Sequence, residues 1–252
     1  MRRARVIPCL LIQGNGLVKT RKFKDPVYVG DPVNAMRIFS DEEADEIVVL
    51  DIDASKRGAE PNYELISEMA GEAFMPMAYG GGVTRVEQIR RLIRCGIEKV
   101  VINSAAVRSK EWIREAVGIF GSQAIVGAVD VTKGLLGGYR VVIRSATEET
   151  KLDLDQHIAN LVGAGVGEIL LNSVDRDGTM AGYDLPLIQR VVKRVGVPIV
   201  ACGGAGTVEH LAEGVRSGAS AVAAGSMFVF HGKHRAVLIS YLSSGELRQM
   251  SC

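Results

Sequence analysis

Two carboxylates stand where apolar runs of the sequence end. Asp130 closes the run that starts at Ala124, and Asp51 closes the run that starts near Ile47. A carboxylate among apolar neighbours has a raised pKa and can act as a general acid or base. The alternative is a structural role as a helix cap or a partner in a loop ion pair, and this alternative weighs more for Asp51 than for Asp130.

A glycine pair followed by a helical pattern occurs twice, at Gly81–Gly82 and at Gly203–Gly204. Glycines let backbone N–H groups approach a ligand closely, and a helix start adds a partial positive charge that suits an anion. One such pair could simply turn a strand into a helix. Two pairs, each followed at the same distance by a serine (Ser104 and Ser226), favour two phosphate sites and a ligand with a phosphate at each end.

Both motifs belong to an internal repeat with an offset of 122 positions. The repeat aligns residues 46–104 with residues 168–226 without a gap, and it places Glu46 on Glu168 and Ser104 on Ser226. Such a match spans about two βα units, which is too long for a stacked solenoid repeat. The sequence therefore predicts two homologous halves, about 1–121 and 122–252.

The elements that position these residues alternate along the chain. Eight continuous apolar runs, typical of parallel strands that are buried on both faces, are expected at about 5–12, 46–52, 76–80, 99–103, 124–130, 168–173, 198–203 and 221–225. Helical spacing is found at 33–39, 63–69, 86–93, 112–119, 154–161, 187–195, 208–215 and 236–242. Eight such units predict an α/β fold, a single-domain (β/α)8 TIM barrel over residues 1–252. A doubly wound open sheet is the alternative.

Composition excludes several classes of protein. The chain has 252 residues, of which 47% are hydrophobic, and a net charge of +1, so no overall field favours nucleic acid or an anionic membrane. We find no run of membrane-spanning length and no signal peptide, and we expect a cytoplasmic protein. The four cysteines lack metal-ligand or disulfide spacing, so we expect reduced thiols, no metal site and no cofactor; they are Cys9, Cys95, Cys202 and Cys252.

Polar residues are also expected at both ends of such a barrel. Active sites lie at the carboxyl ends of the strands, which here are Leu11, Asp51, Gly82, Asn103, Asp130, Asn172, Gly204 and Ser226. Lys19, after the first strand, could bind a phosphate or be an ordinary solvated lysine. At the amino ends, four charges of alternating sign predict a ring across the floor of the barrel, formed by Arg5, Glu46, Lys99 and Glu168. From the residues alone, this ring could be an ion-pair plug without further function.

The motifs together carry a family resemblance along the whole chain. From end to end, the sequence resembles the cyclase subunit of imidazole glycerol phosphate synthase, a barrel that receives ammonia from a glutaminase. The matching segments include 5–10, 18–19, 30–32, 50–52, 80–82, 102–103, 120–124, 130, 167–171, 173–179, 182–184 and 203–206.

The resemblance implies roles for individual residues. It implies that Asp130 is the general acid and that Lys19 is a loop residue over the substrate. The implied phosphate ligands are Gly82, Asn103 and Ser104 at one end and Gly204, Gly225 and Ser226 at the other. Asp51, Asn172 and Asp177 are expected to contact the substrate. The floor ring of Arg5, Glu46, Lys99 and Glu168 becomes the expected gate for ammonia.

One departure from the family pattern concerns catalysis. The family has an aspartate at the end of its first strand, where this chain has Leu11, and the internal repeat independently sets Leu11 opposite Asp130. Leucine can neither transfer a proton nor accept a hydrogen bond. Asn172 also stands where the family usually has threonine, and residues 20–28 differ from the family's substrate loop.

This combination resembles a second, paralogous copy of the cyclase found with surface-polysaccharide genes. The expected function is an ammonia-channelling subunit that works with a glutaminase and a sugar amidotransferase in the amidination of a nucleotide-linked sugar. Two alternatives remain. One is an authentic cyclase of histidine biosynthesis that tolerates Leu11, and the other is a non-catalytic scaffold that activates a glutaminase.

Overall fold

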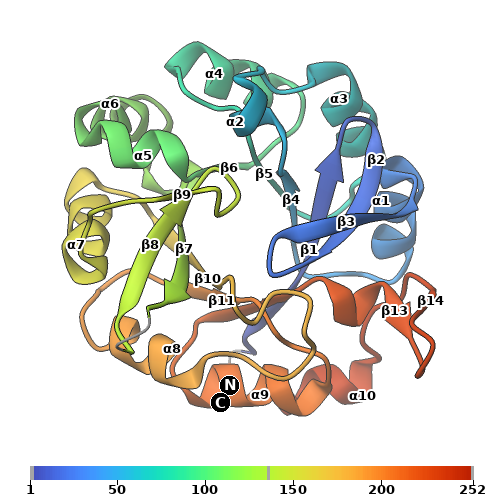
Figure 1. Cartoon of the computed structure of the whole chain (residues 1–252). Coiled ribbons are helices and arrows are strands. Elements are labelled where there is room, and N and C mark those ends of the chain that lie inside the picture. The colour runs from blue at the N-terminus through green and yellow to red at the C-terminus, as the bar shows by residue number, and fades with distance from the viewer. Residues whose placement is uncertain (1–2, 135–136, 251–252) are drawn as a thin grey trace.

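The chain folds into a closed barrel of eight parallel strands surrounded by helices (Figure 1). The computed structural model describes residues 3–134 and 137–250. In order around the barrel, the strands are β1 (Arg5–Gln13), β4 (Ile47–Asp51), β5 (Met77–Gly80), β6 (Lys99–Ile102), β7 (Ile125–Lys133), β10 (Glu168–Ser173), β11 (Ile199–Cys202) and β12 (Ala221–Ala224). β12 pairs with β1, with Arg5 opposite Ala221, and this pairing closes the barrel. The fold expected from the sequence is confirmed, and the open sheet is excluded.

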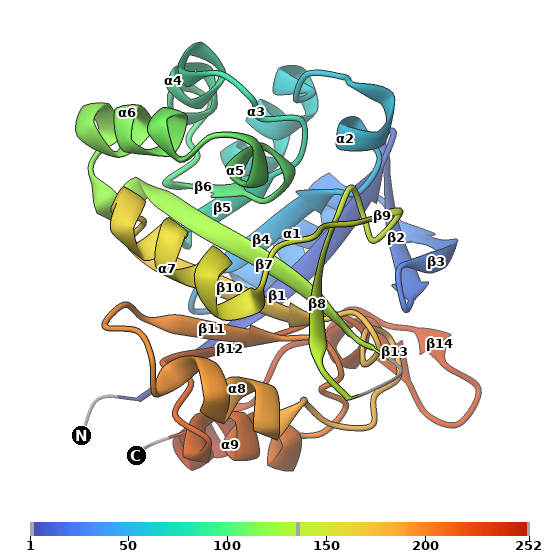
Figure 2. The same cartoon turned by 60° about the vertical axis from the view of Figure 1, so that its left-hand side comes forward.

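Two antiparallel extensions repeat the internal symmetry. β1 continues into β2 (Gly16–Arg21) and β3 (Lys24–Gly30), and β7 continues into β8 (Tyr139–Ile143) and β9 (Glu148–Glu149). Each extension therefore grows from the first strand of one half of the chain. Both lie at the same end of the barrel (Figure 2), where they stand beside the carboxyl ends of the strands.

The helices follow the strands as the repeat predicts. They are α1 (Pro32–Asp41), α2 (Ala54–Arg57), α3 (Tyr63–Glu72), α4 (Val86–Arg94), α5 (Ser104–Arg108), α6 (Lys110–Phe120), α7 (Leu154–Ala164), α8 (Leu185–Val192), α9 (Val208–Arg216) and α10 (Ser244–Leu247). Short 3-10 turns lie at Ser122–Ala124, Ser226–Phe228 and Arg248–Met250. Several helices begin where a polar side chain accepts a backbone N–H, as Asp31 does for α1 and Thr207 for α9.

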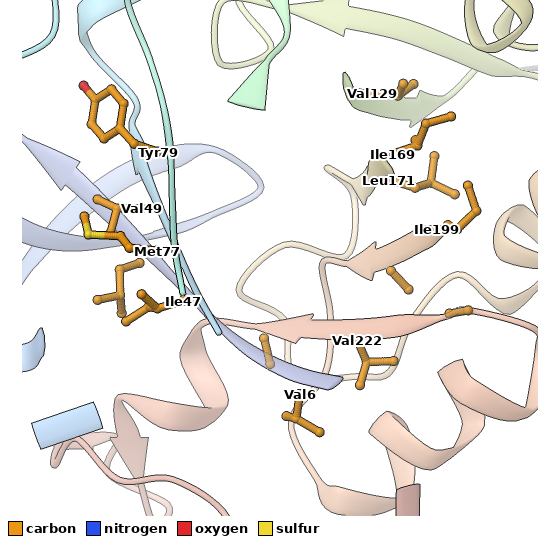
Figure 3. Packing of buried hydrophobic residues seen from close by; sticks show 14 of the residues in the cluster. Val6, Ile47, Val49, Met77, Tyr79, Val129, Ile169, Leu171, Ile199 and Val222 are labelled. Atoms are coloured by element: carbon orange, nitrogen blue, oxygen red, sulfur yellow. The ribbon is translucent and has the colours of Figure 1, made fainter. Parts of the chain in front are cut away.

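The strands bury both faces, and this creates two apolar layers. Outward-facing residues such as Val6, Ile47 and Val222 pack under the helices (Figure 3). Inward-facing residues such as Cys9 and Ala223 fill the barrel with another cluster. The unbroken apolar runs in the sequence are explained by this arrangement, because each strand needs apolar side chains on both faces.

The helix expected over 236–242 is wrong. Ala236–Val237 is strand β14, which pairs with β13 (Phe230–His231), and the last helix begins only at Ser244. The Ser243 hydroxyl accepts the N–H of Glu246, and the Glu246 carboxylate accepts the N–H of Ser243, so the helix start is fixed there. The residues before Ser243 pack against the barrel and do not form a helix: Tyr241 packs on the Phe228 ring, and its hydroxyl donates to the Val6 carbonyl.

Among the residues that the structure describes, no helix has the length and apolar character needed to span a bilayer.

Candidate functional site

A cavity of about 590 Å³ opens at the carboxyl ends of the strands. Its lining brings together residues that are far apart in the sequence, among them Asp51, Gly82, Asn103, Asp130 and Asn172. A smaller cavity of about 20 Å³ adjoins it and contains Gly204, Gly225 and Ser226. The two cavities share Cys9, Leu11, Asp177 and Cys202. Both cavities are lined by residues from before and after residue 121, and their sizes differ greatly.

Asp130 lies at the end of the apolar barrel interior and is held by two amides. Asn103 Nδ2 donates to Asp130 Oδ2 at 2.8 Å, and Asn172 Nδ2 donates to Asp130 Oδ1 at 3.1 Å. The Asp130 pKa is raised to about 7, mainly by burial; the nearby Asp177 acts in the same direction, and the two amide hydrogen bonds act against it. Both protonation states are therefore accessible near neutral pH, as general acid–base catalysis requires.

Leu11 occupies the wall that both cavities share. Its side chain is 6% exposed and belongs to the apolar cluster inside the barrel. At this position the site has an apolar surface, and Asp130 has no carboxylate partner from β1.

The Asp130 prediction concerns the pH dependence of stability. The folded chain binds the Asp130 proton more tightly than the unfolded chain does. Proton binding at Asp130 therefore stabilises the fold fully below about pH 4, and this stabilisation is lost as the pH rises through about 7. Asp130→Asn should remove the dependence. Its free energy of unfolding, relative to the natural chain, should increase by about 2 to 4 kcal/mol between pH 4.5 and pH 8. Urea denaturation at several pH values measures this difference, and a constant difference would contradict the prediction.

At the Gly82 end of the larger cavity, the backbone of the glycine pair lies close to neighbouring segments of the chain. Gly81 and Gly82 have φ of 124° and 71°. A Cβ on Gly82 would lie 2.5 Å from the Ala59 carbonyl oxygen, so a larger residue does not fit. The Gly82 N–H donates to Ser55 Oγ at 3.4 Å, and Ser104 Oγ accepts the N–H of Arg144 at 3.1 Å. Of the three ligands expected here, the Asn103 amide is already engaged with Asp130.

Lys19 differs from its expected place in a loop. It lies in strand β2, is 5% exposed, and donates from Nζ to the Cys9 carbonyl at 2.7 Å. Its ammonium is next to Gly225 in the smaller cavity, and burial lowers its pKa. The neighbouring Gly204 also lacks room for a side chain, because a Cβ there would overlap the Gly182 carbonyl.

Asp177 and Asp51 are both engaged with the backbone. Asp177 accepts from Thr20 Oγ1 at 2.8 Å and from the Phe23 N–H at 3.2 Å, so it attaches the β2–β3 hairpin to the loop after β10. Burial raises the Asp177 pKa. Asp51 Oδ1 accepts the N–H groups of Asp53 and Ala54, both at 2.9 Å. The helix-cap alternative raised for Asp51 therefore describes its contacts, although its side chain also lines the cavity.

The side-chain oxygen of Asn172 lies in a different environment from the amide nitrogen that contacts Asp130. Its side-chain oxygen is buried without a hydrogen-bond partner among the described residues. A Cβ on Gly203 would lie 2.6 Å from this oxygen, so the amide lies against the end of β11.

The four charges at the opposite end form the expected ring. Arg5 is paired with both Glu46 and Glu168, and Lys99 Nζ lies 2.8 Å from Glu46 Oε1 and 3.1 Å from Glu168 Oε2. Each cation thus bridges both carboxylates. The Glu46 side chain is 4% exposed, while Arg5 is 34% exposed and can be reached from outside.

Some residues around the cavity were not singled out from the sequence. Cys202 and Cys9 lie in the wall that the two cavities share, and the thiols of Cys9, Cys95 and Cys202 are all free, as expected. Cys252 lies outside the described residues. Arg85, Arg108, Arg144 and Ser145 also line the larger cavity. Arg144 and Ser145 come from the β8–β9 turn, whose position over the cavity has no local signal in the sequence.

Comparison with known proteins gives consistent matches along the chain. The family described as histidine biosynthesis protein matches residues 5–235. A Pseudomonas aeruginosa protein, provisionally named imidazole glycerol phosphate synthase subunit hisF2, is 53% identical over 242 residues, which are 96% of each chain. A Vibrio vulnificus protein, provisionally named subunit hisF3 of the same synthase, is 44% identical over 99% of this chain and 96% of its own. Imidazole glycerol phosphate synthase subunit HisF of Thermobifida fusca is 43% identical over 90% of each chain.

Proposed function

The chain belongs to the histidine biosynthesis protein family, and from this premise we propose that it is the cyclase-like synthase subunit of a glutamine amidotransferase. In this role, a glutaminase releases ammonia at the floor of the barrel, and the barrel conducts it to the site at the carboxyl ends of the strands. A ligand with two phosphate groups binds there, one at the Gly82 end and one at the Gly204 end. The ammonia serves the amidination of a nucleotide-linked sugar, and a sugar amidotransferase is the second protein partner.

The observation that carries this proposal is the contrast between the two ends of the barrel. The floor keeps a complete ring of paired charges, and an apolar interior of small and branched side chains joins it to the cavity. Neutral ammonia can cross such an interior, whereas ions and larger polar molecules pay a high desolvation cost there. At the cavity, Asp130 is kept with a raised pKa, but Leu11 leaves it without a partner from β1.

A second candidate is supported by the cavity itself. The proton-transfer group Asp130, the glycine pairs and a large open cavity are all retained, and a scaffold that only activates a glutaminase has no physical need for them. An authentic cyclase that works with Asp130 alone is therefore the runner-up.

The partner prediction tests the ammonia route. The glutaminase should bind the floor at micromolar concentration, and its glutamine hydrolysis should rise on binding. Phe74 is 90% exposed and precedes β5 by a few residues, so it lies toward this floor. An exposed aromatic residue is a typical anchor of an interface, and Phe74→Ser should weaken binding about tenfold or more.

Val237→Ser is the matched control for Phe74→Ser. Val237 is 50% exposed, and it lies in the β13–β14 hairpin, which follows the carboxyl end of β12. Calorimetry and a glutamine hydrolysis assay with the glutaminase of the same organism measure both effects. If no such glutaminase binds the natural chain at micromolar concentration, the ammonia route is refuted.

A further inference from the structure

Three arginines line the Gly82 end of the larger cavity: Arg85, Arg108 and Arg144, here called the arginine rim. Arg85 is paired with Glu60, which also contacts Arg91. Arg108 is exposed at the cavity and forms no ion pair with a carboxylate in residues 3–134 and 137–250. The positive charge at this end is therefore only partly neutralised by the chain itself.

The β8–β9 turn is held over this end at a conformational cost. Arg144, Ser145 and Ala146 have φ of 54°, 54° and 60°, which is the left-handed region that residues other than glycine disfavour. Contacts with the neighbouring loops fix the turn: Ser145 Oγ donates to the Ile52 carbonyl at 2.7 Å, and the Arg144 guanidinium donates to the Lys56 carbonyl at 3.0 Å. These contacts place Arg144 beside Ser104 and beside helix α2, which carries Ser55.

Donors for one phosphate are present without the arginine rim. Ser55 Oγ accepts from the Gly82 N–H and Ser104 Oγ accepts from the Arg144 N–H, so both hydroxyl hydrogens are free to donate to an anion. A phosphate monoester carries a charge of about −1.5 to −2 near pH 7. Arg85 is paired with Glu60, but the guanidinium groups of Arg108 and Arg144 add to these hydroxyl donors, and arginine is suited to bidentate binding of phosphate oxygens.

Among the described residues that line the other end of the site, Lys19 is the one cation. The cavity at this end is about 20 Å³, and Lys19 is buried against the Cys9 carbonyl with a lowered pKa. The sequence repeat alone would give two equal phosphate sites. The two ends differ in their cations because the β8–β9 turn and the segment after Gly82 contribute arginines to one end only.

We propose that the Gly82 end of the cavity binds a diphosphate ester, with one phosphate at the Ser55 and Ser104 hydroxyls and the second on the arginine rim. This inference rests on the phosphate site of the proposed function, and it goes further by naming the class of ligand. The cavity volume of about 590 Å³ is within the usual range for small-molecule sites.

The experiment compares inorganic pyrophosphate with inorganic phosphate by isothermal titration calorimetry at fixed ionic strength. Pyrophosphate should bind at least about tenfold more tightly than phosphate. The double variant R108Q/R144Q should lower the affinity for pyrophosphate about tenfold and change the affinity for phosphate less than about threefold, because the hydroxyl donors remain. R94Q is the matched control, since Arg94 is an exposed arginine that does not line the cavity, and it should leave both affinities unchanged.

The outcomes separate this inference from the proposed function. If phosphate binds but pyrophosphate binds no better, the diphosphate inference is overturned and the phosphate site stands. The inference also fails if R94Q reduces pyrophosphate affinity as much as R108Q/R144Q does, because the preference then reflects overall charge. If neither anion binds, the phosphate site of the proposed function is refuted as well.

Discussion

Leu11→Asp is expected to raise the ammonia-dependent formation of imidazole glycerol phosphate from the ribulosyl intermediate of histidine biosynthesis. The natural chain should form little or none of this product. Cyclisation needs protons taken up and released around one bound substrate, and Asp130 alone cannot act on both sides of it. One positioned acid–base group is typically worth about 10²- to 10⁴-fold, and the substitution should recover part of this factor.

The surroundings of Leu11 can accept a carboxylate. The side chain lines both cavities, and the buried Lys19 ammonium belongs to the wall of the smaller one, so a cation is available near the new charge. Complete recovery is not expected, because Asn172 and the hairpin over residues 20–28 also differ from the family pattern.

Leu11→Asn is the matched control, since it has the size and polarity of aspartate but does not transfer protons. Turnover with an ammonium salt is measured for the natural chain and both variants, with thermal melting to confirm folding. Equal gains from Leu11→Asp and Leu11→Asn would refute the acid–base explanation. Turnover of the natural chain at the rate of an authentic cyclase would make the runner-up function the correct one.

Glu46→Gln is expected to destabilise the fold by about 3 kcal/mol. Both oxygens of the nearly buried Glu46 carboxylate accept from Lys99 at 2.8 Å, and one of them also accepts from Arg5. The substitution leaves two cations with one carboxylate, and it turns an amide N–H₂ toward a cationic donor. Removing one partner of a buried ion pair typically costs about 3 to 5 kcal/mol, and the partial exposure of Arg5 favours the lower value.

Urea denaturation measures this effect, and two further variants make the result specific. Glu209→Gln breaks an exposed pair with Arg216 and should leave the denaturation midpoint unchanged. Combining Lys99→Met with Glu46→Gln restores a neutral ring. The loss of stability in the double variant should therefore be smaller than the sum of the losses measured for the two single variants. Additive losses would show that the four charges do not act as one unit.

The barrel and the position of its site could be predicted because both depend on local patterns that are repeated. Apolar runs such as 168–173 require burial on both faces, and the offset of 122 positions shows that two halves share one architecture. Once a closed parallel barrel is inferred, the carboxyl ends of the strands must meet, so Asp130, Gly82 and Asn172 were expected in one site. The ring of Arg5, Glu46, Lys99 and Glu168 follows from the same rule at the other end.

Local patterns were less informative where two conformations fit the same residues. The apolar residues over 236–242 have helical spacing, yet they form a short strand and a buried segment, because their contacts with Phe228 and β1 are made by distant parts of the chain. Lys19 looked like a loop residue, and only the pairing of β2 with β1 buries it beside Gly225.

The sequence by itself determined which chemical groups this protein has: one carboxylate at Asp130, a leucine in place of its partner, two glycine pairs and four floor charges. Only the tertiary structure decided how they are used. Asn103 and Asn172 hold Asp130 instead of lying free for substrate, Asp51 caps a turn, and the β8–β9 turn brings Arg144 to the larger cavity but not to the smaller one. The physical reason is that hydrogen-bond partners and burial depend on contacts between segments separated by tens of residues, and these contacts are fixed when the barrel closes.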